Sequence, residues 1–375
     1  MTEDSTGRSV SIVIAGGGTG GHLVPGLAVA EETRRRLPES RVVFMGTGRP
    51  VEQHMIPKAG FELRTVDAPR MPGRFYQWPF FPFKLWRSIG RAKAALREIK
   101  PGVVIGLGGY GSVPVVLAAK KLGIPIVLME QNSIPGRANR FLSRYAREVY
   151  AQFESSRAYF RDPRSAYVLG NPLRAGIASG SRERAVKLFA LDPGRRTLLV
   201  LGGSQGARTI NESVCGALAE LGRMTSFQVI HQTGAADYEN ALARHRESGA
   251  RGFVSAFIDE MPEALAAADL VLTRSGATTL AELAVAGKPS ILVPYPFAAE
   301  DHQRVNAQAF VDAGASVMVR NSNLTSFEVA RLVKELLFDD KPLVRMADAA
   351  RTLARPDAAR DVCNHIFVIL ERAQS

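Results

Sequence analysis

Ser11-Ile-Val-Ile-Ala-Gly-Gly-Gly-Thr-Gly-Gly-His22 places a glycine-rich turn directly after an apolar run with the length and composition of a buried β-strand. A second stretch of this kind, Thr197-Leu-Leu-Val-Leu-Gly-Gly-Ser-Gln-Gly-Ala-Arg208, lies in the other half of the chain, and each stretch leads into a helical pattern. A strand, a glycine turn and a helix start together direct backbone N–H groups at one point, which suits a phosphate or another anion. The repeat predicts two α/β domains that face each other and bind two ligands or two halves of one.

Strand and helix signals alternate along the chain, which predicts parallel sheets covered by helices on both faces. Glycine and proline interrupt the pattern at Gly170-Asn-Pro-Leu-Arg174, so we place the domain change there. The N-terminal domain is then residues 1–172 and the C-terminal domain is residues 173–355. We expect a final helix, at about 356–375, to pack back on the N-terminal domain.

Composition and charge narrow the class of protein. The chain has 375 residues, of which 46% are hydrophobic, as in a soluble globular protein of two domains. Cys215 and Cys363 show no disulfide or metal-ligand spacing, so we expect a reducing cytoplasm. The first residues do not have the pattern of a secretory signal, and no apolar run is long enough to predict a membrane span. The net charge of +12 predicts an anionic partner: nucleic acid, acidic lipid or a phosphorylated metabolite.

The positive charge concentrates in an aromatic and basic segment, residues 70–100, which has eight Arg and Lys residues and one Glu. Three interpretations are a membrane interface, an ordinary core and stacking on nucleic-acid bases. Its prolines argue against one buried helix, and the chain has no recognised RNA-binding motif. We therefore favour an anionic membrane surface and no nucleic acid. The residues predicted to contact the membrane are Phe75, Trp78, Phe80, Phe81, Phe83, Lys84, Trp86 and Arg87.

The first glycine turn contains the letters of a dinucleotide-binding pattern, Gly16-x-Gly18-x-x-Gly21. The predicted second strand, Arg41–Gly46, does not end in the acidic residue that binds ribose in NAD folds, so NAD is disfavoured. A tight turn that packs a helix on a strand is the plain structural alternative. His22 follows this turn at a helix start, where the helix dipole favours the neutral imidazole. It is a candidate general base, with a structural hydrogen bond as the alternative.

The second glycine turn, Gly202–Gly206, is the better cradle for a diphosphate, because Ser204 adds a hydroxyl donor to the backbone N–H groups. Arg174 could neutralise a phosphate, or it could be a solvated loop residue. Farther on, Thr273–Glu282 reads as a strand end, a Ser-Gly turn and a helix start. Glu282 could accept hydrogen bonds from a ribose diol, or it could merely complement the helix dipole.

A long loop after a later strand ends in Asp301-His-Gln303, whose side chains could bind a polyol. The sequence has no Asp-x-Asp pair and no cluster of His and Cys residues. We therefore expect neither a metal ion nor another cofactor.

Taken together, these residues resemble the MurG family, and the resemblance covers nearly the whole chain. The matching motifs are Gly17-Gly-Thr-Gly-Gly-His-Leu-Val-Pro-Gly-Leu-Ala28, Gly108-Gly-Tyr-Gly-Ser112, Glu130-Gln-Asn132, Gly170-Asn-Pro-Leu-Arg174, Gly202-Gly-Ser-Gln-Gly-Ala-Arg208, Phe257-Ile-Asp-Glu-Met261, Arg274-Ser-Gly-Ala277 with Glu282, and Asp301-His-Gln303.

The resemblance implies a GT-B fold, in which two Rossmann-like domains with parallel sheets flank a cleft. It implies that the Ile258 backbone contacts uracil, that Glu282 binds the ribose hydroxyls and that the Ser204 loop binds the diphosphate. The implied donor-binding positions are Thr19, Gly20, Gly21, Asn132, Arg174, Ser204, Ile258, Ala277, Thr278, Thr279, Leu280, Ala281, Glu282 and Gln303. The implied acceptor-binding positions are Gly17, Gly18, Gly108, Gly109 and Tyr110.

The implied activity is an inverting, metal-independent transfer of GlcNAc from UDP-GlcNAc to the C4 hydroxyl of MurNAc in lipid I. The product, lipid II, serves peptidoglycan synthesis, and with it cell shape and division. We expect a peripheral protein on the cytoplasmic face of the cell membrane, with other cell-wall synthesis proteins as possible partners. His22 is the first candidate for the general base and Glu130 the second. Two alternatives remain: a UDP-sugar 2-epimerase on the same architecture, and a non-catalytic nucleotide-binding protein docked on a membrane.

Overall fold

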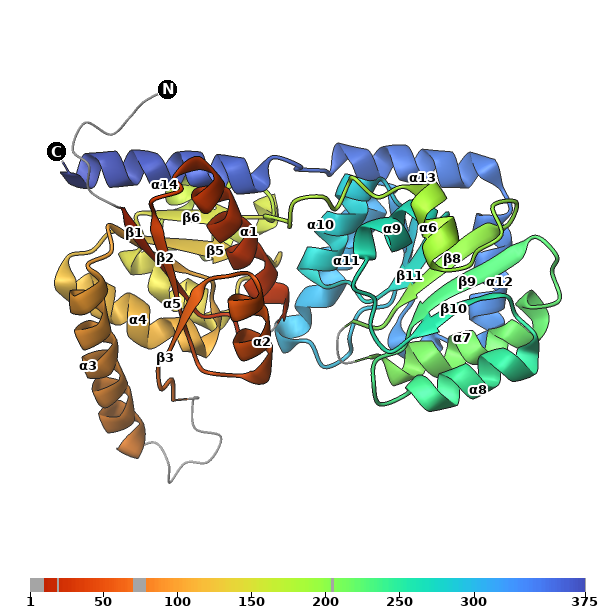
Figure 1. Cartoon of the computed structure of the whole chain (residues 1–375), viewed down its shortest axis with the longest axis horizontal. Coiled ribbons are helices and arrows are strands. Elements are labelled where there is room, and N and C mark those ends of the chain that lie inside the picture. The colour runs from red at the N-terminus through yellow and green to blue at the C-terminus, as the bar shows by residue number, and fades with distance from the viewer. Residues whose placement is uncertain (1–9, 19, 70–78, 204–205, 375) are drawn as a thin grey trace. The chain divides into compact units, whose positions relative to one another are not determined.

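The computed structural model describes residues 10–18, 20–69, 79–203 and 206–374. It divides the chain into two compact units. Unit 1 comprises Met1–Arg174 and Pro356–Ser375, and unit 2 comprises Ala175–Arg355. The chain therefore leaves unit 1 once and returns to it for its last helix (Figure 1). The first division falls two residues beyond the one predicted from the sequence, and the second coincides with it.

Unit 1 is built on a seven-stranded parallel sheet with the strand order β3-β2-β1-β4-β5-β6-β7. The central strands β4 and β5 are buried along their whole length, because helices cover both faces of the sheet. The strands are β1 (Ser11–Ala15), β2 (Arg41–Gly46), β3 (Glu62–Thr65), β4 (Val103–Gly106), β5 (Ile126–Glu130), β6 (Glu148–Ala151) and β7 (Ala166–Val168). The sequence pattern did not predict β7, a short strand with one buried residue.

Six α-helices of unit 1 are described: α1 (Gly20–Arg36), α2 (Pro50–Lys58), α3 (Phe81–Ile99), α4 (Gly109–Leu122), α5 (Arg137–Leu142) and α14 (Ala358–Gln374). The last of these, α14, lies alongside α1 (Figure 1). It adds Val362, Cys363 and Ile366, each fully buried, to the core that α1 forms with the sheet. The C-terminal helix is therefore part of the hydrophobic core of unit 1.

Unit 2 repeats the architecture with a six-stranded parallel sheet in the order β10-β9-β8-β11-β12-β13. The strands are β8 (Arg196–Leu201), β9 (Phe227–Gln232), β10 (Gly252–Ser255), β11 (Leu270–Thr273), β12 (Ser290–Leu292) and β13 (Ser316–Met318). The α-helices are α6 (Arg182–Leu188), α7 (Arg208–Leu221), α8 (Tyr238–Ser248), α9 (Met261–Ala267), α10 (Ala277–Ala286), α11 (His302–Asp312), α12 (Ser326–Leu337) and α13 (Asp340–Thr352).

Two of these helices, α6 and α13, were missing from the sequence-based expectation. Their N-terminal signals are nevertheless present, because Ser181 accepts a hydrogen bond from the backbone of α6 and Asp339 accepts one from that of α13. These capping residues are sequence signals that would have located both helices.

The two sheets have the same kind of strand order. The second and third strands of each sheet add on one side of its first strand, and the later strands add on the other side. The order reverses between β1 and β4 in unit 1 and between β8 and β11 in unit 2. In open parallel sheets of this kind, ligands bind outside the carboxyl ends of the strands at that reversal. The fold therefore directs attention to the loops that follow these four strands.

Candidate functional site

The turn after β1 and the turn after β4 touch each other at the reversal point of the first sheet. Gly16, with φ of +100°, leaves no room for a side chain, because a Cβ there would lie 2.7 Å from the Gly108 carbonyl oxygen. Gly108 itself has φ of +88° and precedes α4. The glycines are required here by backbone conformation and by close approach of two main chains.

Both helices at this edge begin earlier than the sequence indicated. We expected α1 to begin at Leu23 and α4 at Val113, because glycines weaken helix propensity. In the structure, Gly20 opens α1 and Gly109 opens α4, so the glycines form the first helical turns. His22 and Tyr110 therefore lie in first turns, and both are partly buried.

Arg49 connects the first glycine turn to α4. Its guanidinium donates a hydrogen bond to the Gly18 carbonyl oxygen at 2.8 Å and lies 5.3 Å from the centre of the Tyr110 ring. Sequence reasoning did not single out Arg49. A basic residue directly after the second strand of a doubly wound sheet is a signal that could have found it.

Glu130, the second candidate for the general base, is held in a structural role. Its side chain is 4% exposed, and its two oxygens accept hydrogen bonds from the backbone N–H groups of Asn132 and Gly136 and from the side chains of Asn132 and Asn139. Burial raises the pKa of this carboxyl, and these hydrogen bonds oppose the rise. The carboxylate shapes the loop that presents Asn132, so we withdraw Glu130 as the base.

Several predicted residues lie outside the part of the chain that the structure describes: Thr19, Phe75, Trp78 and Ser204. At the end of unit 1, Arg174 is exposed. Of the other unit 1 positions, Gly17 is buried, Gly18 and Gly20 are partly buried, and Gly21 and Gly109 are exposed.

The glycine turn of unit 2 is as tightly enclosed as its counterpart in unit 1. A Cβ at Gly202 would lie 2.6 Å from the Ala207 nitrogen, and one at Gly206 would lie 2.5 Å from the Thr233 carbonyl oxygen. Gly203, with φ of +81°, is exposed, and a Cβ there would meet no atom within 4 Å. The turn thus packs its flanking glycines inward and leaves Gly203 accessible to a ligand.

Gln232, at the end of β9, joins two loops of this edge and was missed by sequence reasoning. Its Oε1 accepts a hydrogen bond from the Ile258 backbone N–H at 3.0 Å, and its Nε2 donates to the Gly203 carbonyl oxygen at 3.4 Å. The side chain is 4% exposed. Because the Ile258 N–H is already occupied, a ligand can use the carbonyl oxygen of that residue but not its amide.

The loop after β11 leads into α10 on the opposite side of the reversal point. Gly276 caps α10, and the N-terminus of this helix carries the positive end of its dipole. Glu282 is the sixth residue of α10 and is partly buried, as are Thr278, Thr279 and Ala281, whereas Ala277 and Leu280 belong to the buried face. The positive end of the α10 dipole therefore lies at this loop, and Glu282 follows one turn later.

The loop after β12 is fixed by its own residues. The Gln303 side chain accepts a hydrogen bond from the Tyr295 backbone N–H at 3.0 Å, and the Ser275 hydroxyl donates to the Gln303 carbonyl oxygen at 2.8 Å. Glu300 and Asp301 adopt positive φ values of 52° and 56°. Strain of this kind in residues other than glycine gathers at ligand-binding loops.

The aromatic and basic segment presents exposed rings at the start of α3. Phe80, Phe83 and Trp86 are 64%, 62% and 67% exposed, and the rings of Phe83 and Trp86 stack with centroids 6.2 Å apart. Lys84 and Arg87 are also exposed, and Phe81 is partly buried. This exposure contradicts the core interpretation for the three rings. The sequence pattern predicts that this helix begins at about Lys84. The helix begins at Phe81, because Pro82 is tolerated in the first turn.

One group of potential metal ligands among the described residues was not visible in the sequence. Cys215, His231 and His245 are buried on neighbouring elements, with their ligand atoms within 4.8 Å of one another. Hydrogen bonds already use the facing ring nitrogens. The Asn211 amide donates to the Thr233 carbonyl oxygen, so its own oxygen accepts from His231 Nε2, and His231 Nδ1 then accepts from His245 Nε2.

A metal ion at this cluster would have to replace the hydrogen bond between the two rings. Burial also lowers the pKa of His231 to about 3 and that of His245 to about 4. Both imidazoles are therefore neutral at pH 7. We interpret the pair as a buried hydrogen-bond network that holds α7, α8 and β9 together.

The buried pair of His231 and His245 predicts that the protein loses stability in acid. Because the native pKa values lie below the ordinary histidine value, the unfolded state binds protons first as the pH falls below about 6.5. The free energy of unfolding should fall by about 2 kcal/mol per imidazole between pH 7 and pH 5. Urea denaturation at both pH values measures it. The free energy of unfolding of a double variant His231→Gln/His245→Gln should fall less between pH 7 and pH 5 than that of the wild-type protein. An equal fall in the variant and the wild type would contradict the assignment.

Comparison with known proteins assigns both units to one family. Residues 12–151 match the glycosyltransferase family 28 N-terminal domain, and residues 197–362 match the glycosyltransferase family 28 C-terminal domain. A relative in Myxococcus xanthus is 43% identical over 364 residues, which cover 96% of this chain and 94% of the relative. Its name is UDP-N-acetylglucosamine--N-acetylmuramyl-(pentapeptide) pyrophosphoryl-undecaprenol N-acetylglucosamine transferase.

Solved structures show the same architecture. The crystal structure of Acinetobacter baumannii MurG matches with a TM-score of 0.76 and 29% identity, covering 95% of this chain and 99% of that one. A UDP-N-acetylglucosamine 2-epimerase of Listeria monocytogenes, described as putative in its title, matches with a TM-score of 0.70 at 14% identity, covering 97% of this chain and 98% of that one. At 14% identity, the second match shows only that the fold is shared.

Proposed function

This chain belongs to the MurG family of glycosyltransferase family 28, and we propose that it transfers N-acetylglucosamine from UDP-GlcNAc to lipid I. The observation that carries the proposal is the Myxococcus xanthus relative, which is named as this N-acetylglucosamine transferase and is 43% identical over nearly the full length of both chains. The product is lipid II, the disaccharide-linked precursor of peptidoglycan. The predicted GT-B fold class is confirmed by the two parallel α/β sheets and by the structural match to MurG.

The donor occupies the reversal point of the second sheet in this proposal. The uracil N3–H donates to the Ile258 carbonyl oxygen, since the amide of that residue is held by Gln232. Glu282 accepts the ribose hydroxyls, and the diphosphate takes the backbone N–H groups of the glycine turn and of the α10 start, with Ser204 beside them. The family resemblance gives Arg174 as a cation for the phosphates. It gives Thr19–Gly21 and Asn132 in unit 1 and Gln303 in unit 2 as the remaining donor positions.

The transfer inverts the anomeric centre. The C4 hydroxyl oxygen of MurNAc forms a bond to C1 of GlcNAc while the bond from C1 to the diphosphate breaks, and the electron pair leaves with UDP. His22, in the first turn of α1, takes the hydroxyl proton. The leaving diphosphate is stabilised by main-chain dipoles in place of a cation, so the reaction needs no metal ion and no other cofactor.

The acceptor reaches the protein from a membrane. No helix in the described part of the chain combines the length and apolar character that crossing a bilayer requires. The exposed Phe80, Phe83 and Trp86, beside Lys84 and Arg87, support peripheral binding to an anionic bilayer surface on its cytoplasmic side. Association with other cell-wall synthesis proteins remains a prediction.

The activity is tested with radiolabelled UDP-GlcNAc and a short-chain lipid I analogue in the presence of EDTA. We expect label to pass to the acceptor at the same rate with and without EDTA. A strict requirement for a divalent cation would contradict the main-chain cradle. Formation of an epimer from UDP-GlcNAc alone, without transfer, would favour the epimerase alternative.

Replacement of His22 tests the general base. His22→Ala should lower kcat by roughly 100-fold and leave the affinity for UDP-GlcNAc nearly unchanged, because proton transfer contributes to the transition state and not to donor binding. The matched control is His54→Ala, an exposed histidine on α2, which should keep the wild-type rate. Full activity of the His22 variant would reject the assignment.

A further inference from the structure

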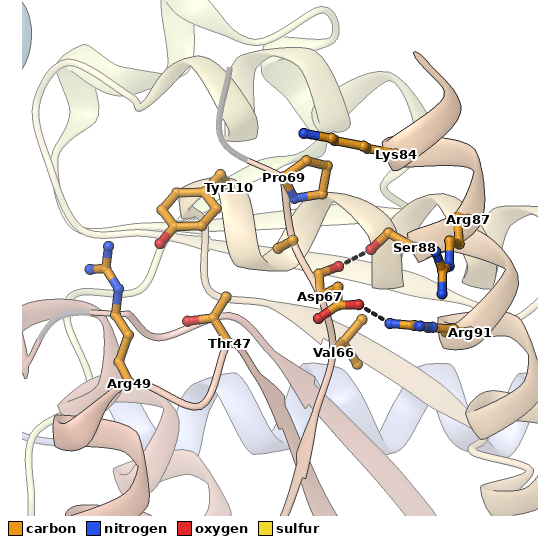
Figure 2. A pocket seen from close by; sticks show the side chains of 11 residues that line it. Thr47, Arg49, Val66, Asp67, Pro69, Lys84, Arg87, Ser88, Arg91 and Tyr110 are labelled. Atoms are coloured by element: carbon orange, nitrogen blue, oxygen red, sulfur yellow. Dashed lines mark hydrogen bonds and ion pairs between the residues drawn. The ribbon is translucent and has the colours of Figure 1, made fainter. Parts of the chain in front are cut away.

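Unit 1 contains a cationic pocket at the carboxyl edge of its sheet. It has a volume of about 580 Å³ and opens between the ends of β2 and β3 and the first turns of α3 and α4 (Figure 2). The cationic pocket is lined by Thr47, Arg49, Val66, Asp67, Ala68, Pro69, Lys84, Arg87, Ser88, Arg91 and Tyr110.

The charges of this pocket are only partly balanced by protein groups. The Asp67 carboxylate pairs with Arg91, so one negative charge of the pocket balances one positive charge (Figure 2). The Ser88 hydroxyl donates to the Asp67 carbonyl oxygen. Among the described residues, neither Lys84 nor Arg87 has a carboxylate within ion-pair distance. With Arg49, three positive charges therefore face a pocket that no second acidic residue lines, which favours a multiply charged anion.

The position of the pocket limits which anion it receives. On α3, Lys84 and Arg87 line the pocket, while Phe83 and Trp86, one residue before each, present the exposed rings. At the other end, Tyr110 stands in the first turn of α4, directly after the glycine turns. The pocket thus joins an exposed aromatic surface to the turns that the family resemblance assigns to the acceptor.

We propose that the cationic pocket binds the diphosphate of the lipid-linked acceptor, an inference that rests on the proposed function. The polyprenyl chain leaves over Phe83 and Trp86, and the first sugar lies toward Tyr110. Arg87 and Lys84 bind the phosphate oxygens, with the guanidinium suited to two oxygens at once. A phospholipid headgroup shares the phosphate chemistry, but it has no saccharide to place against Tyr110 and the glycine turns.

The test removes Lys84 and Arg87, the two pocket cations of α3 for which no carboxylate partner is found among the described residues. A double variant Lys84→Gln/Arg87→Gln is compared with Lys93→Gln/Arg97→Gln, which removes equal charge from the same helix outside the pocket. With a short-chain, water-soluble acceptor analogue, the pocket variant should raise the KM for the acceptor by about tenfold or more. Its kcat at saturating acceptor and its KM for UDP-GlcNAc should stay near wild type, and the control should match wild type throughout.

A binding measurement without turnover separates this inference from the proposed function. Both tryptophans of the chain belong to the aromatic and basic segment, and Trp86 borders the pocket residues, so tryptophan fluorescence reports on this site. Titration with farnesyl diphosphate should show binding that weakens about tenfold in the pocket variant and not in the control. If the wild-type protein binds farnesyl diphosphate in this way but transfers no sugar, the proposed function fails and the diphosphate site stands.

Vesicles distinguish the two sources of phosphate. Binding to vesicles of phosphatidylglycerol and phosphatidylcholine, measured by sedimentation, should weaken in both double variants, because both lose positive charge from α3, and it should weaken more in the pocket variant, whose Lys84 and Arg87 lie beside the exposed rings. A selective loss of vesicle binding in the pocket variant, with an unchanged KM for the acceptor analogue, would assign the pocket to a phospholipid headgroup and overturn the proposal. Identical behaviour of the two variants in every assay would also overturn it.

Discussion

The close approach of main chains at the carboxyl ends of parallel strands is the constraint on which the rest of this structure depends. In unit 1, the turn after β1 presses against the turn after β4, and a Cβ at Gly16 would collide with the Gly108 carbonyl oxygen. In unit 2, Gly202 and Gly206 are enclosed in the same way. Only glycine fits, so the helices can begin beside the strands and direct their N–H groups outward.

Buried polar side chains fix the loops around these turns. Glu130 organises the loop that presents Asn132, and Gln232 ties the Gly203 turn to the Ile258 loop. A carboxylate or carboxamide is stable at such depth because its hydrogen-bonding groups are satisfied by the loops that it positions. Each loop is therefore ordered before a ligand arrives, which lowers the entropy lost on binding.

The sequence predicted most of the fold, because apolar strands and amphipathic helices alternate with clear glycine and proline punctuation. It missed the short elements β7 and α6, it missed α13, and it placed helix starts too late where glycines form helical turns, at Gly20 and Gly109. For the site, the glycine motifs lie in loops at the carboxyl ends of parallel strands, where the strand order reverses. Arg49 and Gln232 escaped because their contacts join residues far apart in the chain, and the buried histidine pair escaped for the same reason.

A crystal structure of the protein with UDP-GlcNAc tests the central claim most directly. The account predicts uracil beside the Ile258 carbonyl oxygen, ribose on Glu282, and the diphosphate on main-chain N–H groups at the reversal point of the second sheet. Density for the nucleotide at the first sheet, or a diphosphate held by side chains or a metal ion with no contact to the glycine turn or the α10 start, would contradict it.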